Sequence, residues 1–444
     1  MYPDCAEVMS RIRSRQAVVG VIGLGYVGIP LVLAITSAGF KAVGFDIDPA
    51  RVAALNSGSS AIKHIPDEAI RAIVGSRQFS ATSDFGRLAA CDAILIAVPT
   101  PLTKHREPDL SYVVRTTETI AEHLRPCQLI VLESTTWPGT TIEVQRPILE
   151  AGGLKSGKDF FLAFSPERED PGNENYGTRS IPKVVGGDGE VAGDLACELY
   201  GAFVDKVVRV STPATAEAVK LTENIFRAVN IALVNELKIV YDRMGIDVWE
   251  VIDAAKTKPF GFMPFYPGPG LGGHCIPIDP FYLTWKAREF DITTRFIELA
   301  GQINSSMPRY VVARLGEALD GRLSKGLNGA RILLIGLAYK KNIDDMRESP
   351  SLRLIELIEE RGGAVDYFDP YIPVIPPTRE HAALAGRRSQ QMTADALARY
   401  DAVLIATDHD DVDWQMLANH AKLVIDTRNA MARNGVDADV VVKA

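Results

Sequence analysis

Short apolar runs alternate with segments of helical length over the first half of the chain. Residues 17–22 predict a buried strand that ends in a Gly-rich turn, and residues 31–38 and 41–45 predict a helix and a second strand. Further short strands are expected at 93–98, 129–133, 160–164 and 183–185. This alternation is typical of a parallel sheet that helices cover on both faces.

The pattern becomes helical near residue 212. Residues 216–241 predict one long helix, and more helical segments follow around a Pro/Gly-rich interruption at 264–280. An apolar run at 331–336 opens a second α/β unit, whose other strands are expected at 364–368, 402–406 and 423–425. We therefore predict the fold class α/β, with two Rossmann-like domains joined by a central helical domain that contains a long helix. The predicted domain boundaries are 1–210, 211–305 and 306–444.

Composition narrows the class of protein. The chain has 444 residues, of which 47% are apolar and 23% charged, so it should bury sizeable cores. A net charge of -8 without basic runs argues against partners such as nucleic acid or an anionic membrane. The apolar runs are too short for a membrane span, and the N-terminus lacks the apolar stretch of a signal peptide, so we expect a cytoplasmic protein. Five scattered cysteines without a CxxC pair predict neither a disulfide framework nor a metal site.

The first strand leads into a GxGxxG motif made by Gly23, Gly25 and Gly28, and Asp46 closes the second strand. In a dinucleotide site these glycines permit a tight turn, let the backbone approach a pyrophosphate, and let helix pack on strand. The Asp46 carboxylate can accept hydrogen bonds from ribose hydroxyls and would repel a 2′-phosphate, which favours NAD over NADP. Arg51 lies close enough to weaken that preference. A purely structural glycine turn is the alternative.

Three polar loops follow further strands, at the sheet edge where open α/β folds bind ligands. They contain Thr100 in VPTP, Thr135 in ESTTWPGTT, and Glu167 with Arg168 in SPEREDPGN. Turn chemistry and a solvated polar loop explain these residues equally well.

The long helix and the following Pro/Gly-rich loop carry the strongest chemical signals. Lys220, Asn224 and Arg227 fall on one side of the helix, and an exposed amphipathic face is the alternative. The loop PGPGLGGHCIPIDP places Cys275 shortly before Asp279, which begins a helix. A cysteine near a helix N-terminus can have a lowered pKa and act as a nucleophile, whereas most cysteines are buried and inert.

The last domain opens with GLAYKKNIDDMRESPS, whose cations lie at the ligand edge of the second sheet. This stretch predicts an anion site for phosphate or, alternatively, a solvated charge cluster.

These motifs together resemble the UDP-glucose/UDP-mannosaminuronate dehydrogenase family over nearly the whole chain. The matching stretches are GLGYVGIPL, VPTP, ESTTWPGTT, SPEREDPGN, KLTENIFRAVNIALVNE, PGPGLGGHCIPIDP and GLAYKKNIDDMRESPS. The resemblance implies an NAD-binding N-terminal domain, a central dimerisation domain and a UDP-sugar-binding C-terminal domain. It therefore also implies a homodimer or higher homo-oligomer built through the central helices.

The resemblance also implies residue roles. By this resemblance Cys275 is the thiol nucleophile, and Lys220, Asn224 and Asp279 are further catalytic residues. Glu167 and Thr135 match a pair of residues associated with the catalytic water. The implied cofactor contacts are Gly23, Leu24, Gly25, Val27, Gly28, Asp46, Arg51, Thr100, Thr135 and Arg347. The implied substrate contacts are Glu167, Arg168, Lys220, Asn224, Arg227, Tyr266, Gly270, Tyr339 and Lys340.

The implied reaction is a two-step, four-electron oxidation of C6 of a UDP-sugar through a thiohemiacetal and a thioester, for surface polysaccharide precursors. The motifs SPEREDPGN and PFGFMPFYPGPGLGGHC resemble the branch acting on UDP-N-acetylhexosamines, especially UDP-N-acetylglucosamine. The UDP-glucose branch usually has an acid where Pro171 stands and an Arg where Pro259 stands, although Lys256 or Lys258 could replace that Arg. The alternative substrates are UDP-N-acetylmannosamine and UDP-glucose. The alternative kinds of protein are a catalytically silent nucleotide-sugar-binding protein and a 6-phosphogluconate-like hydroxyacid dehydrogenase.

Overall fold

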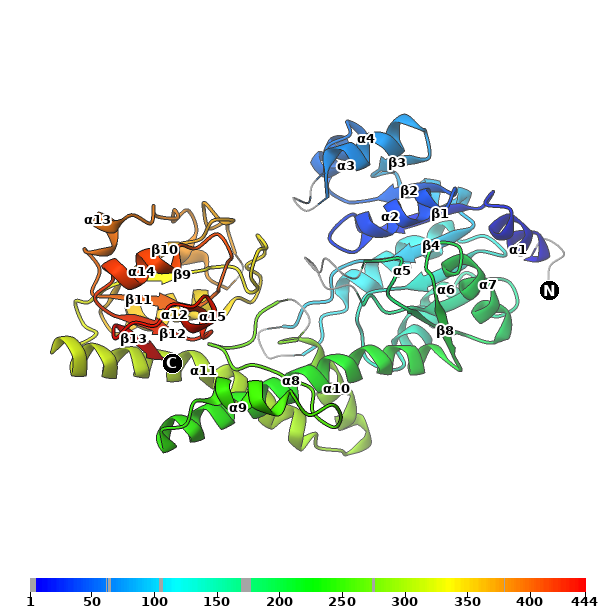
Figure 1. The fold of residues 1–444 in the computed structure, drawn as a ribbon. Coiled ribbons are helices and arrows are strands. Elements are labelled where there is room, and N and C mark those ends of the chain that lie inside the picture. The colour runs from blue at the N-terminus through cyan, green and yellow to red at the C-terminus, as the bar shows by residue number, and fades with distance from the viewer. Residues whose placement is uncertain are drawn as a thin grey trace. The chain divides into compact units, whose positions relative to one another are not determined.

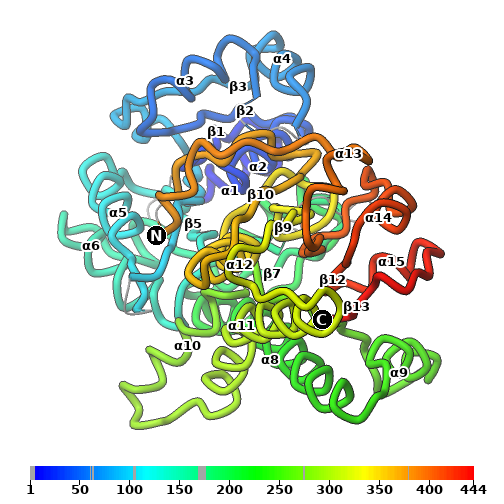
Figure 2. The backbone as a smooth tube through the Cα atoms, turned by 90° about the vertical axis from the view of Figure 1, so that its left-hand side faces the viewer, coloured from blue at the N-terminus to red at the C-terminus, as the bar shows by residue number. Residues whose placement is uncertain are grey.

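The chain divides into two compact units (Figures 1 and 2). The computed structural model describes residues 5–60, 62, 65–103, 107–168, 177–273, 276–378 and 380–444. The first unit comprises Met1–Glu223 with Phe281–Thr293, and the second comprises Asn224–Pro280 with Thr294–Ala444.

The first unit is built on an eight-stranded sheet, counted over the described residues. Its spatial order is β3-β2-β1-β4-β5-β6-β7-β8. The strands are β1 (Val18–Ile22), β2 (Lys41–Phe45), β3 (Phe79–Thr82), β4 (Ala93–Ile96), β5 (Leu129–Leu132), β6 (Phe161–Phe164), β7 (Lys183–Gly187) and β8 (Val207–Val210). Each strand predicted for this region is present. The unpredicted strands β3 and β8 are short and only partly buried, so they lack a continuous apolar run.

The prediction of a parallel sheet is wrong for its last two strands. β1 to β6 run parallel, but β7 pairs antiparallel with β6, and β8 then pairs parallel with β7. A parallel return needs a crossover, usually a helix, whereas an antiparallel return does not. The described part of the connection between β6 and β7 contains no helix.

Helices cover this first sheet. Alternate strand residues such as Val19, Leu95 and Val131 form one core with apolar side chains of α1, α2 and α7. The intervening strand residues point to the opposite face and are buried as well, which explains the continuous apolar runs in the sequence. The helical elements of this part are α1 (Cys5–Arg13), α2 (Gly28–Ser37), α3 (Pro49–Asn56), α4 (Asp67–Gly75), η1 (Phe85–Ala90), α5 (Ser111–His123), η2 (Thr141–Gln145), α6 (Arg146–Glu150) and α7 (Glu190–Tyr200).

The long helix α8 (Pro213–Met244) begins in the first unit and continues in the second (Figure 1). It contains the predicted helix 216–241 and extends it at both ends. The other helical elements of the middle of the chain are α9 (Val248–Ala255), α10 (Asp279–Ala287), η3 (Arg288–Phe290) and α11 (Arg295–Leu323). In the part of the chain that the structure describes, no helix is long and apolar enough to cross a membrane.

The second unit contains a five-stranded parallel sheet, again counted over the described residues, in the order β10-β9-β11-β12-β13. Residues of α11 and α12 pack on one face, and residues of α13, α14 and α15 pack on the other. The remaining elements are β9 (Arg331–Ile335), α12 (Pro350–Glu360), β10 (Ala364–Phe368), η4 (Ala382–Leu384), α13 (Ala394–Leu397), β11 (Ala402–Ile405), α14 (Trp414–His420), β12 (Val424–Asp426), α15 (Ala430–Arg433) and β13 (Val441–Lys443).

The two sheets repeat one turn at their first strands. Gly23 N donates to Phe45 O at 2.9 Å, and Gly336 N donates to Phe368 O at 2.8 Å. Both glycines have positive φ, +93° and +84°. The predicted fold class, with two Rossmann-like domains and a central helical domain, is confirmed.

Candidate active site

The turn after β1 has the geometry of a pyrophosphate site. A Cβ at Gly23 would lie 2.5 Å from Ala97 O, and one at Gly28 would lie 1.9 Å from Gly23 O. A Cβ at Gly25 would meet no atom within 4 Å, so the backbone there faces open space. Helix α2 begins at Gly28, which aims its N-terminal N–H groups at this turn. Leu24 and Val27 belong to the same turn, and the whole arrangement fits a dinucleotide.

Asp46 directly follows β2 and is held in a fixed orientation. Its Oδ2 accepts from Leu24 N at 3.0 Å and pairs with Arg51 at 3.1 Å, and its Oδ1 accepts from Asp48 N at 2.9 Å. Asp46 is buried, whereas the Arg51 side chain is 39% exposed. The carboxylate is therefore available as an oriented acceptor beside the Gly-rich turn, with Arg51 reducing its negative charge.

The second sheet has a corresponding acid, Asp369, whose oxygens are occupied. Its Oδ2 accepts from Leu337 N at 2.6 Å and from Ala338 N at 3.0 Å, and His409 lies at 3.1 Å from the same oxygen. Its Oδ1 accepts from Tyr371 N at 2.8 Å and from Ile372 N at 3.0 Å, so both oxygens of this fully buried carboxylate are already used by the protein. The geometry therefore assigns the dinucleotide to the first sheet.

The loops after β4 and β5 are linked at the same sheet edge. Ser134 Oγ donates to Val98 O at 2.7 Å, and Tyr282 OH donates to Thr100 O at 3.0 Å. Thr100 is buried and Thr135 is half-buried. The loops that carry these two predicted threonines lie side by side because β4 and β5 pair in register.

The turn after Thr135 is anchored by a residue that sequence reasoning missed. Glu217 of α8 is completely buried and accepts from Gly139 N, and its other oxygen accepts from Thr141 N at 2.9 Å and Thr141 Oγ1 at 2.7 Å. A charged residue at a core position of a helix was the available signal. Burial raises the pKa of Glu217, and the hydrogen bonds from the turn oppose that rise.

Glu167, after β6, contacts a buried cluster. Lys183 Nζ lies 2.6 Å from Glu133 Oε2 and 3.2 Å from Glu167 Oε2, and Tyr200 OH donates to the other oxygen of Glu133. Lys220 Nζ of α8 donates to the backbone carbonyl of Glu167. Sequence reasoning missed Lys183, although a charged residue that opens a buried strand was the signal for it.

Arg168 makes contacts within the protein. Its guanidinium pairs with Glu223 of α8 and donates to Pro182 O at 2.6 Å. The predicted substrate role of Arg168 stays a prediction, since these contacts by themselves give it a structural use.

Lys220 and Asn224 lie one turn apart on α8, and both are nearly buried. Asn224 Nδ2 donates to Asp279 Oδ2 at 2.5 Å, and Asp279 is the first residue of α10. The contact joins two predicted catalytic residues. Arg227, further along α8, is exposed. Cys275 and its neighbour His274 lie outside the described residues.

The Gly-rich loop before Cys275 packs against the opening loop of the last domain. A Cβ at Gly272 would lie 2.5 Å from Tyr339 Cβ, and one at Gly273 would lie 2.9 Å from Tyr339 Cε2. Gly273 N donates to Arg347 O at 3.1 Å. The glycines are thus required by close approach, and two motifs far apart in sequence lie together. Gly270, with φ +145°, approaches Pro350 in the same way.

The other predicted contacts of the second unit have partners of their own. Arg347 forms an ion pair with Asp345 at 2.6 Å, and Lys340 is half-buried in the same loop. Tyr266 OH donates to Asp253 at 2.6 Å, and Lys256 pairs with that carboxylate at 2.8 Å.

The cysteines that the structure describes are not activated thiols. Cys91 is buried, which raises its pKa to about 12, and burial also raises the pKa of Cys197. Cys127 takes part in a disulfide, which the scattered cysteines did not predict because spacing along the chain does not show which thiols meet in space.

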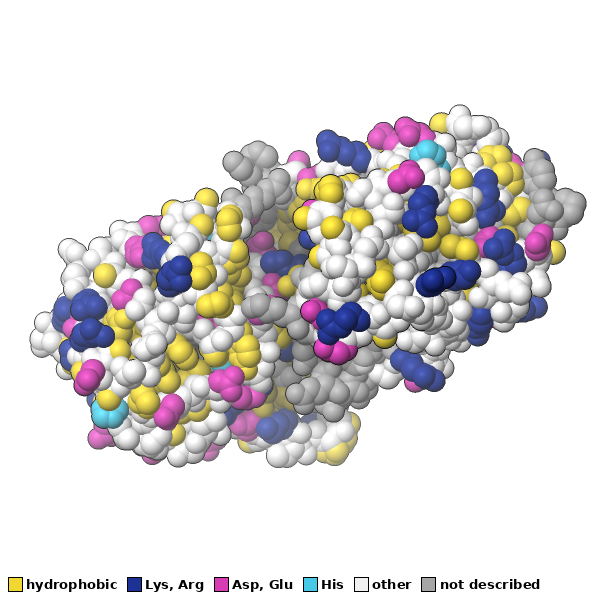
Figure 3. Space-filling view, turned by 90° about the horizontal axis from the view of Figure 1, so that it is seen from above, with side chains coloured by type: hydrophobic (Ala, Val, Ile, Leu, Met, Phe, Trp, Pro, Cys, Tyr) yellow, Lys and Arg dark blue, Asp and Glu magenta, His cyan; other side chains and the backbone are white. Residues whose placement is uncertain are grey.

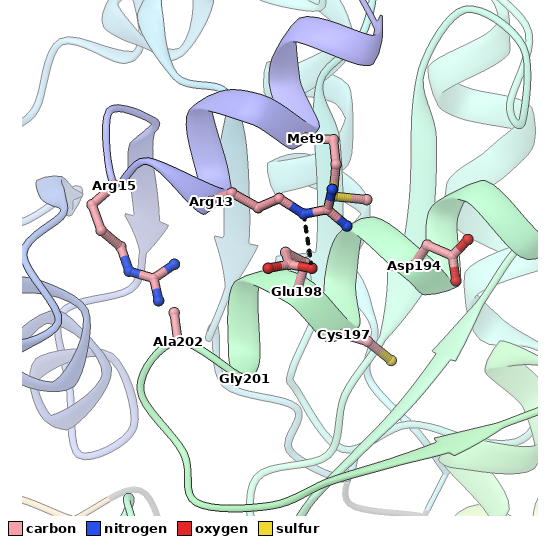
Figure 4. A pocket seen from close by; sticks show the side chains of 8 residues that line it. All are labelled: Met9, Arg13, Arg15, Asp194, Cys197, Glu198, Gly201 and Ala202. Atoms are coloured by element: carbon pink, nitrogen blue, oxygen red, sulfur yellow. Dashed lines mark ion pairs between the residues drawn. The ribbon is translucent and has the colours of Figure 1, made fainter.

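Two surface features do not involve the predicted site residues. A cavity of about 530 Å³ between α1 and α7 is lined by polar groups such as Arg13, paired with Glu198, and holds none of the predicted residues (Figure 4). On the face drawn in Figure 3, basic and acidic side chains are interspersed.

Comparison with known proteins identifies the chain. Three domains of the UDP-glucose/GDP-mannose dehydrogenase family match it in order: the NAD binding domain at residues 17–204, the central domain at 214–306 and the UDP binding domain at 333–433. A UDP-N-acetyl-D-glucosamine 6-dehydrogenase of Pseudomonas aeruginosa is 35% identical over 409 residues, which cover 91% of this chain and 93% of that protein. The chain belongs to this family.

Further relatives of the dehydrogenase differ in substrate. A UDP-N-acetyl-D-mannosamine dehydrogenase of Pyrococcus horikoshii is 35% identical over 417 residues, covering 93% of this chain and 95% of that protein. The solved structure of a UDP-D-ManNAc dehydrogenase from Pyrococcus horikoshii superimposes with a TM-score of 0.85 at 33% identity, covering 96% of this chain and 98% of that one.

The family settles the general activity. This dehydrogenase is an NAD-dependent oxidoreductase that acts on nucleotide sugars, as its NAD binding and UDP binding domains require. The alternatives of a silent binding protein and of a hydroxyacid dehydrogenase are therefore set aside.

Proposed function

We propose that the dehydrogenase oxidises C6 of a UDP-N-acetylhexosamine to the uronic acid, with UDP-N-acetylglucosamine as substrate. Two relatives named UDP-N-acetyl-D-glucosamine 6-dehydrogenase, at 35% and 33% identity, support the gluco sugar. Pro171 and Pro259 stand where UDP-glucose enzymes usually have an acid and an Arg, which supports an N-acetylated sugar. UDP-N-acetylmannosamine is the second candidate, supported by the Pyrococcus relative.

The observation that carries the chemistry is the buried pair Asn224 and Asp279. A buried amide that donates to a buried carboxylate has one N–H left for a substrate oxygen, in a fixed direction. Lys220, one helical turn away, supplies a second polar hydrogen. We assign these donors to the alkoxide and tetrahedral oxyanions that form at C6.

The proposed reaction consists of two oxidations and one hydrolysis. NAD, which the turn of Gly23, Gly25 and Gly28 would hold, would supply the two-electron acceptor of each oxidation, one molecule for each, and the hydroxyl proton released in each oxidation passes to solvent. After the first, the Cys275 thiolate attacks the aldehyde and forms a C–S bond, and the second oxidation converts this thiohemiacetal to a thioester. Water then attacks the thioester carbon, its proton passes to the Glu167 carboxylate, and the C–S bond breaks to return the thiolate. Thr135 helps to place the water.

Substrate contacts and cofactor contacts complete the proposal. Asp46 receives the ribose hydroxyls of NAD beside the turn of Gly23, Gly25 and Gly28. Tyr339 and Lys340 hold the nucleotide sugar, and Arg347 contacts the cofactor. We also propose the three-domain division at residues 210 and 305, and pairing of two chains through the central domain.

NADH formation with a panel of UDP-sugars tests the substrate. We expect UDP-N-acetylglucosamine to give the highest kcat/KM and two NADH per sugar. A higher kcat/KM for UDP-N-acetylmannosamine or UDP-glucose would overturn the substrate assignment, and one NADH per sugar would overturn the four-electron reaction.

A cysteine substitution tests the covalent route. Cys275→Ser should lower steady turnover by at least about a hundredfold, since an alcohol of much higher pKa replaces the thiol. Intact-protein mass spectrometry should detect an adduct on the introduced serine. Cys197→Ser is the matched control and should leave turnover unchanged. Near-normal production of uronic acid by Cys275→Ser would exclude a covalent role for Cys275.

A further inference from the structure

The cluster behind Glu167 contains three ionisable groups that the mechanism above does not use. Lys183 opens β7, Glu133 follows β5, and Tyr200 ends α7, so two strands and the helix that packs on them deliver these groups to one point. Lys183 and Glu133 are buried, with side chains 6% and 0% exposed. Glu167 is the most exposed carboxylate of the cluster, at 16%.

The charges of this cluster do not balance within it. Glu133 and Glu167 share the ammonium of Lys183, so two carboxylates face one cation. Burial raises the pKa of Glu133, Lys183 opposes that rise, and Glu167 adds to it. Burial also favours a neutral lysine, but the two carboxylates raise the pKa of Lys183, which stays charged. Tyr200 remains a neutral donor, because burial and then Glu133 raise its pKa.

Fold stability alone does not explain why charged residues occupy these buried positions. Ion pairs buried this deeply stabilise a fold no better than apolar side chains of similar size. Of the described side chains in this network, the most exposed is that of Glu167, the residue assigned to the water. Lys220 donates to the carbonyl of that same residue, and Arg168, next in sequence, is fixed by Glu223.

We propose that Lys183 is a positioning residue that keeps the Glu167 carboxylate ionised and aimed at the water that hydrolyses the thioester. Glu133 and Tyr200 hold the ammonium in place. This inference rests on the proposed function, because it assumes the thioester and the role of Glu167. In this role Lys183 acts through Glu167 and is assigned no contact with the substrate or the water.

Replacing Lys183 should affect hydrolysis and spare the first oxidation. In Lys183→Met, Glu167 loses the Lys183 ammonium and keeps the nearby Glu133 carboxylate, so a larger fraction of Glu167 is protonated at neutral pH. We expect kcat to fall at least tenfold, and the acid limb of its pH profile to move up by about one unit or more. The first NADH in a single turnover should form within about threefold of the wild-type rate, and the acyl-enzyme should accumulate in intact-protein mass spectra.

A second variant should move the pH profile of kcat in the opposite direction, which distinguishes an electrostatic effect from a packing defect. Glu133→Gln removes the competing negative charge while Tyr200 can still donate to the amide oxygen. The acid limb should therefore move to lower pH. A packing defect would not displace the two profiles in opposite directions.

The matched control is Lys286→Met. Lys286 is also buried, between Glu143 and Glu289 at 2.6 Å each, in the same unit but outside the assigned site. It should leave the pH profile and the mass spectra as in the wild type. Wild-type profiles and no acyl-enzyme in Lys183→Met would overturn the role of Lys183, as would shifts of the same sign in both cluster variants. Absence of any uronic acid from the wild-type protein would instead overturn the proposed function.

Discussion

At the scale of single residues, the pairing of Asp46 with Arg51 underlies the proposed preference for NAD over NADP. The carboxylate holds the guanidinium at 3.1 Å, so removing the carboxylate releases a cation where the ribose is proposed to bind. We expect Asp46→Ala to weaken NADH binding and to shift the NADH/NADPH affinity ratio toward NADPH by about tenfold or more. Titration calorimetry with both nucleotides measures this without any substrate. Asp48→Asn, which can still cap α3, is the control, and an unchanged ratio in Asp46→Ala would remove Asp46 from the specificity site.

Lys238 illustrates the energetic effect of one buried charge. It lies on α8, is 3% exposed, and packs over the Trp249 ring at 4.6 Å. Burial lowers its pKa to about 8, and Asp242 only partly opposes this. The folded pKa lies below the unfolded value of about 10.4, so the folded protein binds fewer protons between these values. The penalty of about 3 kcal/mol is therefore complete below pH 8 and disappears as pH rises through the unfolded pKa.

Lys238→Met should consequently increase the free energy of unfolding at pH 7 by about 1–3 kcal/mol, because loss of the ring contact offsets part of the gain. Guanidinium unfolding at pH 7 and pH 10 should show the difference shrinking at the higher pH. Lys256→Met, which replaces an exposed lysine at the end of α9, serves as the comparison. An equal increase at both pH values would mean that packing, and not charge, is responsible.

At the scale of elements, α8 organises the loops of the sheet edge. Glu217 fixes the turn at Gly139 and Thr141, and Lys220 fixes the carbonyl of Glu167. Both contacts lie within the first unit. The helix thus positions two loops from neighbouring strands with side chains three residues apart.

Glu217→Ala should destabilise the first unit by about 2–4 kcal/mol, since it leaves two buried N–H groups without an acceptor. The loop that carries Thr135 should loosen as well, which hydrogen exchange of residues 133–141 would detect. Glu217→Gln keeps one acceptor oxygen, so its stability should lie between those of the wild type and Glu217→Ala. If both variants matched the wild type in thermal unfolding, α8 would not anchor this turn.

At the scale of the whole molecule, α8 presents an exposed apolar stripe. Phe226, Leu233 and Val240 follow each other at seven-residue spacing and are 48%, 52% and 45% exposed, and Met244 continues the stripe. Exposed apolar side chains at this spacing form one face of a helix, which is the pattern that helix pairing uses. The stripe supports the proposed dimer.

Leu233→Asp should convert the assembly to monomers, because it places a charge in the centre of the stripe. Sedimentation velocity over a range of concentrations measures the state. Tyr112→Asp, on an exposed position of α5, is the matched control and should leave the assembly unchanged. Monomers in the wild-type protein would exclude the pairing, and an intact dimer in Leu233→Asp would place it elsewhere.

The sequence by itself determined the fold class, the dinucleotide turn and the family. The buried strands and the long helix α8 can be predicted from the local pattern of apolar residues. The glycines of the turn can be predicted because the backbone geometry within a few residues requires them. The same holds for the placement of Thr100, Thr135 and Glu167 at one sheet edge, since parallel strands end on the same side.

Only the tertiary structure decided three features: the direction of β7, the hydrogen bonds that occupy the Asp369 carboxylate, and the partners of Glu167. Strand direction depends on how a connection returns, and β6 and β7 are joined without a described helix. Asp46 and Asp369 lie in equivalent turns and each accepts from a leucine N–H, but only Asp369 also binds Ala338 N and His409. Lys183 and Glu133 are fifty residues apart and meet in the core. Such contacts depend on which side chains the fold brings within hydrogen-bonding distance, and no local sequence pattern encodes that distance.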